Sequence, residues 1–273
     1  MKAESGAQAT LGRGGASAGP GPTILALVAL ANDQSRIDGS VDSLGWVDAR
    51  IAIDLGCTDA TAELCRRRGV ETVMPGAVAG VVARVAPDWV LLLEGHERVP
   101  PDLAAEIRGL IRSSPADGLA AYVIGCEIEF LGRRLRSRVG DATGRVRLVR
   151  RHGWIWDEGE ALLDSRASAG GRPGRLEGRL QARPYESLGH FVTRADVLTT
   201  ATARVRHGGG GGTGWKDLAL YPAAHLARWL PGAGVRDGVV GAIFVVLDAY
   251  RRALVCAKRW ELERWPRPLE NRS

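Results

Sequence analysis

Clustered cysteines, long apolar runs and internal repeats are all missing from this 273-residue chain. Its four cysteines are scattered, with no CxxC pair, which argues against a structural zinc and favours reduced thiols in a cytoplasmic protein. The most apolar late run, residues 239–247, is too short to span a bilayer. Residues 1–22 are rich in Gly, Ala, Ser and Pro and have no apolar centre. We therefore expect a disordered leader there, not a signal peptide.

Lysine is also scarce, since it supplies only Lys2, Lys216 and Lys258 among 37 basic residues. Part of the arginine excess therefore reflects a GC-rich genome. The net charge of +6 is unevenly spread, because residues 1–130 carry −6 and residues 131–273 carry +12. A basic second half suits an anionic partner such as a membrane surface, a phosphorylated substrate or nucleic acid. Nucleic acid fits least well, because interleaved aromatic residues are missing from the arginine-rich half.

The first half alternates short apolar runs with stretches of helical spacing. Strands are predicted at 23–30, 49–54, 71–74 and 89–93, and later at 120–130 and 145–150. Helices are predicted at 35–44, 60–68, 78–85 and 102–111. This alternation predicts an α/β fold built from βαβ units around a mostly parallel sheet.

The second half reads as helical after a stretch with little periodicity. Residues 154–178 show loop signals, residues 185–206 have helical spacing, and five glycines follow at 208–212. Residues 215–265 read as helices in which the cationic pairs at 251–252 and 258–259 stand among apolar positions. Such a basic amphipathic helix can lie in a membrane interface, or it can pack on the main domain with its arginines in water.

Polar side chains follow three of the predicted strands. They are Asn32 with Asp33, Asp54 with Asp59, and Glu94 with His96 and Glu97. Since parallel strands deliver their carboxyl ends to one edge of a sheet, these groups are expected to converge there. That arrangement suits a nucleotide, with one carboxylate on the base or ribose and others holding a metal ion on the phosphates.

Several segments, in order and spacing, carry a resemblance to a known family. They are ANDQSRIDGSVDSLGWVDARIAIDLGCTDATAELCRRRGV, DWVLLLEGHERVPPDLAAEI, FLGRRLR, GRVRLVRR, GRLEGRL, PYESLGHFVTRADVLTTATA and DGVVGAIFVVLDAYRRALVCAKRWELER. Over about residues 23–265 the chain resembles the family 2 glycosyltransferases of GT-A fold. It is most similar to their bacterial lipopolysaccharide-core and cell-envelope branch. The resemblance implies a Rossmann-like mixed sheet that binds a nucleotide sugar, with a helical C-terminal extension. Together with the composition of the first residues and the run of glycines, it divides the chain into a leader (1–22), a GT-A domain (23–206), a linker (207–214) and the extension (215–273).

Residue by residue, the resemblance gives roles to several positions. The donor-binding set is Asn32, Asp33, Asp54, Asp59 and, as a substitute for a missing Arg-Asn pair, Arg84. Glu94 and His96 match the metal-binding acid pair, with His in place of the second Asp. This implies a divalent cation, Mn or Mg, of which manganese tolerates imidazole better. The acceptor-side base matches Glu160 best, in the segment WIWDEGEALL, with Asp157 and Glu158 as rivals.

The residues also allow plainer interpretations. Asp59 precedes a helix and can be its N-cap, and Glu94 and His96 can be ordinary loop residues. The resemblance implies inverting, metal-assisted transfer of a sugar from a nucleotide-sugar donor to a cell-envelope glycan or lipid-linked acceptor. Such a protein would be cytoplasmic and peripheral on the inner face of the membrane. The alternative is a catalytically impaired homologue that acts as a nucleotide-binding or scaffold partner.

Overall fold

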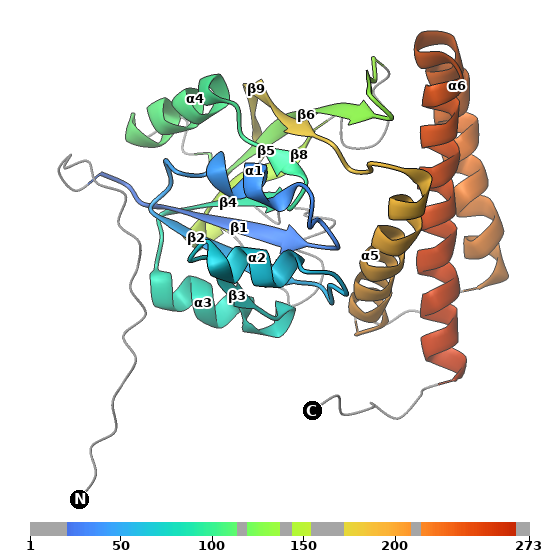
Figure 1. Cartoon of the computed structure of the whole chain (residues 1–273), viewed down its shortest axis with the longest axis horizontal. Helices are drawn as coiled ribbons and strands as arrows, with labels where there is room; N and C mark the ends of the chain where they lie inside the picture. The colour runs from blue at the N-terminus through green and yellow to red at the C-terminus, as the bar shows by residue number, and fades with distance from the viewer. Residues whose placement is uncertain (1–20, 114–118, 137–143, 154–171, 209–213, 266–273) are drawn as a thin grey trace, which may run out of the picture.

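One mixed sheet forms the centre of the molecule, with helices on both faces and a helical wall at one end (Figure 1). The computed structural model describes residues 21–113, 119–136, 144–153, 172–208 and 214–265. Most of the predicted leader and most of the glycine linker lie outside these ranges. The α/β class, the mixed sheet and the helical C-terminal part are confirmed.

The sheet has the strand order β3-β2-β1-β4-β8-β6-β9-β5, with β7 paired to β6. Its strands are β1 (Ile24–Leu30), β2 (Ala49–Asp54), β3 (Glu71–Val73), β4 (Trp89–Glu94), β5 (Glu97–Arg98), β6 (Ala121–Phe130), β7 (Arg133–Arg134), β8 (Arg145–Arg150) and β9 (Gly174–Ala182). The first four spatial positions are parallel, whereas β8 runs antiparallel to both its neighbours. The predicted parallel βαβ part therefore ends at β4.

Alternating apolar residues explain why β1 lies at the centre of the sheet. Ile24, Ala26, Val28 and Leu30 face one hydrophobic cluster, while Leu25 and Leu27 face a second one. The first cluster is covered by α1 (Ile37–Asp42), α2 (Thr61–Arg67) and α4 (Pro101–Arg112), and the second by α3 (Val78–Val85). Burial of both faces is what a continuous apolar run predicts.

The helical wall consists of α5 (Leu188–Gly208) and α6 (Trp215–Arg264), which lie side by side beyond the carboxyl end of β1 (Figure 1). Helix α6 is interrupted at Gly238, whose φ of 61° lies in the region that glycine adopts without strain. The two halves then run back along each other, because His225 pairs with Asp248 at 3.0 Å and Arg252 donates to the Tyr221 hydroxyl at 3.4 Å.

Helix α6 packs on the rest of the chain through its apolar side chains. Phe244 contacts Phe130 with ring centroids 5.3 Å apart, and Val245 is fully buried. Lys258 binds the carboxylate of Asp196 on α5 at 2.6 Å. Within the described part of the chain, no helix combines the length and the apolar character needed to cross a membrane. These contacts favour packing on the main domain for this part of α6.

Candidate functional site

The carboxyl ends of β1, β2 and β4 lie next to one another and bring the predicted polar residues together. In the sheet register, Asp54 lies opposite Leu30 and Glu94 lies opposite Ala29. Asp33 lies in the turn just after β1 and is fully buried. Carboxylates from three segments that are distant in sequence therefore share one rim, as the sequence predicts.

A buried arginine of α5 binds the acids of this rim together. The Arg194 guanidinium donates to Asp33 Oδ1 through Nη1. It also donates to Glu94 Oε2 through Nη2, at 2.8 Å. Nη1 also donates to the carbonyl of Ala31 at 3.1 Å. Arg194 is 1% exposed, so these bonds are shielded from water. Burial lowers the pKa of Arg194, but its neighbours, chiefly Asp33 and Glu94, together raise it by more. The pKa therefore lies above its usual value, and the guanidinium stays charged.

His96 completes the cluster as a neutral ring. Arg194 Nη2 lies 2.8 Å from His96 Nδ1. A guanidinium only donates hydrogen bonds, so Nδ1 must accept and the proton must be on Nε2. Gly95 makes the close approach possible, because a Cβ at that position would lie 2.7 Å from Asp33 Oδ2. The sequence Glu-Gly-His thus fits the acid-rich turn without a clash.

A second buried ion pair closes the cluster from the side of β8. Arg147 Nη2 donates to Glu97 Oε1 at 2.7 Å, and both residues are buried. The other oxygen of Glu97 accepts the backbone amide of Glu94 at 2.8 Å. Glu97 therefore holds the turn after β4 in place. Arg147 Nη2 also lies 4.0 Å from Glu94 Oε1, so its positive charge acts on the acid cluster.

The residues present do not fit a divalent cation. A metal between Glu94 and His96 would need the lone pairs that Arg194 Nη2 now contacts, and the guanidinium stands in that space. Among the described residues, no group of three or more His, Cys, Asp or Glu side chains is placed to hold a metal ion. In this structure the predicted Mn or Mg ligands, Glu94 and His96, instead form an acid–imidazole pair bound by an internal cation.

The remaining predicted donor residues form the turns next to the rim. Asn32 Oδ1 accepts the amide of Thr58 at 2.8 Å, and its φ of 56° is a conformation that Asn adopts more readily than most residues. Asp54 accepts the amides of Gly56 and Cys57 at 2.9 and 2.7 Å. Asp59 accepts the amide of Thr61 at 3.0 Å, but the N-cap of α2 is Ala60, so Asp59 lies one residue before the predicted cap position.

Arg84 lies apart from this rim. It is in the last turn of α3, the helix that precedes β4, and it pairs with Glu71 at the start of β3. Because α3 leads into the amino end of β4, its last turn lies at the opposite edge of the sheet. This position does not fit the donor contact predicted for Arg84. Glu160, Asp157 and Glu158 lie outside the described residues.

A small cavity of about 70 Å³ opens at the rim between the acid cluster and the helical wall. Its basic lining comes from two sides, with Arg145 on β8 and both Arg251 and Arg252 on α6. Arg145 Nη1 lies 3.9 Å from Glu94 Oε1. Asp248 positions the two α6 arginines, accepting from them at 2.9 and 3.1 Å. The cavity therefore presents guanidiniums over a neutralised acid cluster, which suits an anionic ligand.

The sequence did not lead to Arg194 or Arg147 as site residues, although the spacing of buried residues around Arg194 offered a signal. Phe191, Arg194, Ala195 and Leu198 recur at helical spacing on one buried face of α5. A charged residue inside an apolar stripe is almost never fully buried unless it is paired. That exception marks Arg194 as a partner for acids elsewhere, but the sequence does not name them.

The neutral state of His96 makes the fold sensitive to acid. Burial and the neighbouring Arg194 hold the pKa of His96 well below its usual value of 6.5. Below that pH the unfolded chain takes up a proton that the folded chain does not. The free energy of unfolding therefore decreases as the pH is lowered. We expect a loss of about 1 kcal/mol per pH unit below pH 6.5 from this residue. Glu94, whose pKa is lowered by the guanidiniums despite burial, adds a loss of the same sign at lower pH.

Urea unfolding between pH 8 and 5 measures this effect. His96→Gln keeps an acceptor for Arg194 but removes the titration, so its stability should depend less steeply on pH than that of the wild type. His190, whose pKa burial also lowers, leaves a residual slope of the same sign. The exposed His207→Gln serves as the control. Parallel pH profiles for wild type and His96→Gln would show that His96 is not held neutral.

No protein-family model matches this chain, and no curated protein matches it. Among solved structures, the chain is similar to glucosyl-3-phosphoglycerate synthase from Mycobacterium tuberculosis in complex with Mn2+ and UDP-glucose. The TM-score is 0.40 at 16% identity, over 68% of this chain and 79% of that one. It is also similar to S. aureus TarS 1–349 in complex with UDP-GlcNAc, with TM-score 0.40 and 13% identity over 90% and 93% of the two chains. Likenesses of this size do not establish a function, so the case for one depends on the chain's own residues.

Proposed function

We propose that this protein is a glycosyltransferase that binds a nucleotide-sugar donor at the carboxyl edge of its sheet. The observation that supports this most is the shared rim, where Asp54 and Glu94 flank Asp33 although the three are distant in sequence. The family resemblance of the sequence assigns these positions to the donor. The turns held by Asn32 and Asp54 would face the base and ribose.

Arginines would balance the charge of the donor diphosphate. Arg145, Arg251 and Arg252 line the cavity over the acid cluster, and guanidinium forks match phosphate oxygens well. When sugar transfer releases a nucleoside diphosphate, fixed cations that are already in place stabilise the negative charge that develops on the leaving group. No step in this proposal passes through a metal ion, because Arg194 stands between the two predicted ligands.

The acceptor is proposed to be a cell-envelope glycan or glycolipid, which follows from the resemblance and from the basic second half of the chain. A lipid-linked acceptor would require the protein to be peripheral on the inner face of the membrane. The cationic residues of α6 would contribute to such an association. Co-sedimentation with anionic vesicles at low and high salt tests it, and binding that salt abolishes is the expected result.

A second candidate is a catalytically impaired homologue that still binds a nucleotide. It is favoured by the closed acid cluster and by the cavity of about 70 Å³, which is smaller than the roughly 300 Å³ of ordinary ligand pockets. In this case nucleoside diphosphates raise the melting temperature, but no nucleotide sugar in a donor panel is turned over.

Substitution of the proposed acceptor-side base distinguishes these candidates. We expect Glu160→Gln to lower turnover about 100-fold or more, because a general base contributes that much to such a reaction. The rise in melting temperature caused by the nucleotide should not change, since the base contacts the acceptor. Donor consumption is measured for wild type, Glu160→Gln and the rival Asp157→Asn. Full activity in both variants would contradict the base assignment, and an inactive wild type that binds nucleotide would favour the impaired homologue.

A further inference from the structure

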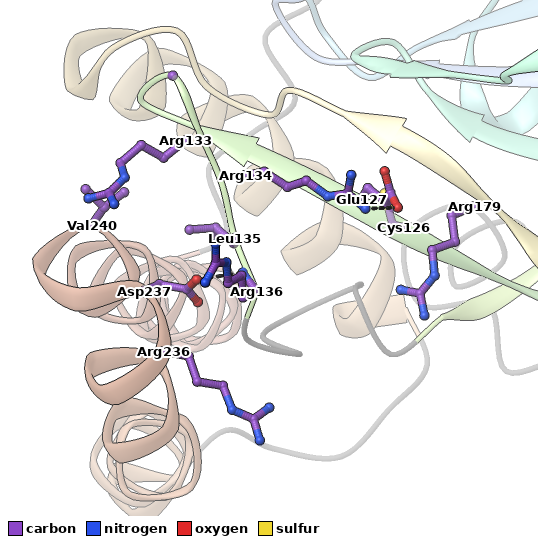
Figure 2. A pocket seen from close by; sticks show the side chains of 11 residues that line it. Cys126, Glu127, Arg133, Arg134, Leu135, Arg136, Arg179, Arg236, Asp237 and Val240 are labelled. Carbon is purple, nitrogen blue, oxygen red and sulfur yellow. Dashed lines mark hydrogen bonds and ion pairs between the residues drawn. The ribbon is translucent and has the colours of Figure 1, made fainter.

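A groove of about 890 Å³ lies outside the candidate site, between the β6–β7 hairpin, β9 and the bend of α6 (Figure 2). Its lining is strongly basic. Five arginines border it, from three separate segments of the chain: Arg133, Arg134, Arg136, Arg179 and Arg236. None of these residues takes part in the proposed donor site.

Two acids in the groove are already engaged, which leaves a surplus of positive charge. Glu127 pairs with Arg134, and Asp237 accepts the backbone amide of Arg136 at 2.6 Å (Figure 2). By contrast, the guanidiniums of Arg179 and Arg236 form no hydrogen bond or ion pair within the part of the chain that the structure describes. Both residues are exposed, so their charges are available to a ligand.

The backbone around the groove is held by ordered elements. Arg179 lies on β9, opposite Gly125 of β6, in a pairing that is parallel. The contact between Asp237 and the Arg136 amide joins the end of the β6–β7 hairpin to α6. Gly238 reverses the chain direction next to Asp237, which places Arg236 at the border of the groove. The arginines therefore project from positions that are fixed before a ligand arrives, which lowers the cost of binding.

We propose that this groove binds a ligand that carries a phosphate or diphosphate group. Guanidinium groups bind phosphate oxygens through two parallel hydrogen bonds, and several of them around one space select for multiple negative charges. The volume is in the range of ordinary ligand pockets. Cys126 of β6 lines both this groove and the cavity of the candidate site, so the two spaces are neighbours. That the ligand is the acceptor of the transfer rests on the proposed function.

Calorimetric titration with inorganic pyrophosphate, in metal-free buffer and with a saturating nucleoside diphosphate present, tests the groove. The double variant Arg179→Gln/Arg236→Gln should bind pyrophosphate at least 10-fold more weakly than the wild type. The matched control, Arg112→Gln/Arg204→Gln, removes two exposed arginines elsewhere and should bind as the wild type does. Equal weakening in both double variants, or none in the groove variant, would overturn the proposal.

Two further measurements identify the source of the phosphate and separate this site from the donor site. Vesicles of phosphatidylcholine with and without phosphatidic acid show whether a lipid phosphate binds, and loss of that binding in the groove variant assigns it to these arginines. Binding of pyrophosphate but not of vesicles assigns a soluble phosphate ester. The rise in melting temperature with a nucleoside diphosphate should be the same in the groove variant and the wild type. If no nucleotide binds at all while pyrophosphate still does, the proposed function fails and the groove stands.

Discussion

Arg194→Met is expected to lower the free energy of unfolding by about 3–5 kcal/mol, because it removes the buried guanidinium that donates hydrogen bonds to both Asp33 and Glu94. Asp33 is fully buried and Glu94 is 8% exposed, so water solvates these carboxylates poorly when the guanidinium is removed. Urea unfolding monitored by circular dichroism measures the change. The same substitution at the exposed Arg204, on the same helix, should change stability by less than about 0.5 kcal/mol.

A double-mutant cycle separates loss of charge pairing from loss of packing. In the double variant Asp33→Asn/Glu94→Gln, both side chains are neutral amides and no longer require a cation beside them. Arg194→Met should then cost at least about 1.5 kcal/mol less than it does in the wild type, which is the coupling expected for residues in one network. An equal cost in both backgrounds would show that Arg194 stabilises the fold by packing alone.

Removing Arg194 should also create a metal site. In Arg194→Ala, three side chains that metals use would face the vacated space. His96 Nδ1 already lies 3.8 Å from Glu94 Oε2 and 4.0 Å from Asp33 Oδ1. We expect Mn2+ to stabilise this variant by about 2.7 kcal/mol when it is present at 100 times its dissociation constant.

The wild type should show no such gain with Mn2+, because its guanidinium already holds both oxygens and the ring nitrogen. Calcium is the matched control ion, since a hard cation binds imidazole poorly. Melting temperatures of wild type and Arg194→Ala, with and without each ion, give the answer. An equal response of the two proteins to Mn2+ would contradict the view that Arg194 occupies the place of the metal.

Local patterns in the sequence predicted most of the sheet. Apolar runs placed β1, β2 and β4 within a residue or two, because strands buried on both faces need continuous hydrophobic residues. Residues 174–178, the first part of β9, were expected to be loop, and no element was predicted at 179–182. The strand contains only Leu176, Leu180 and Ala182 as buried residues among glycines and arginines, so its alternation is weak. Its strand conformation depends on pairing with β6, which is a tertiary effect.

The candidate site could be predicted only in part, for the same reason. Asp33 lies just beyond the end of β1 and Glu94 is the last residue of β4, so the parallel sheet alone brings them together. Their partner Arg194 is about 100 residues further along the chain from Glu94 and comes from a helix whose docking the sequence does not specify. Sequence patterns thus predicted which groups converge, while the cation that neutralises them required the packing of α5.

We propose that the rim between β1, β2 and β4 holds a nucleoside diphosphate without a metal ion. A thermal-shift series of nucleoside diphosphates in EDTA, repeated in Mn2+, tests it most directly. We predict that at least one nucleotide raises the melting temperature equally in both buffers, and that Arg145→Gln reduces this rise while Arg112→Gln does not. Melting temperatures that no nucleoside diphosphate changes, with or without Mn2+, would contradict the claim.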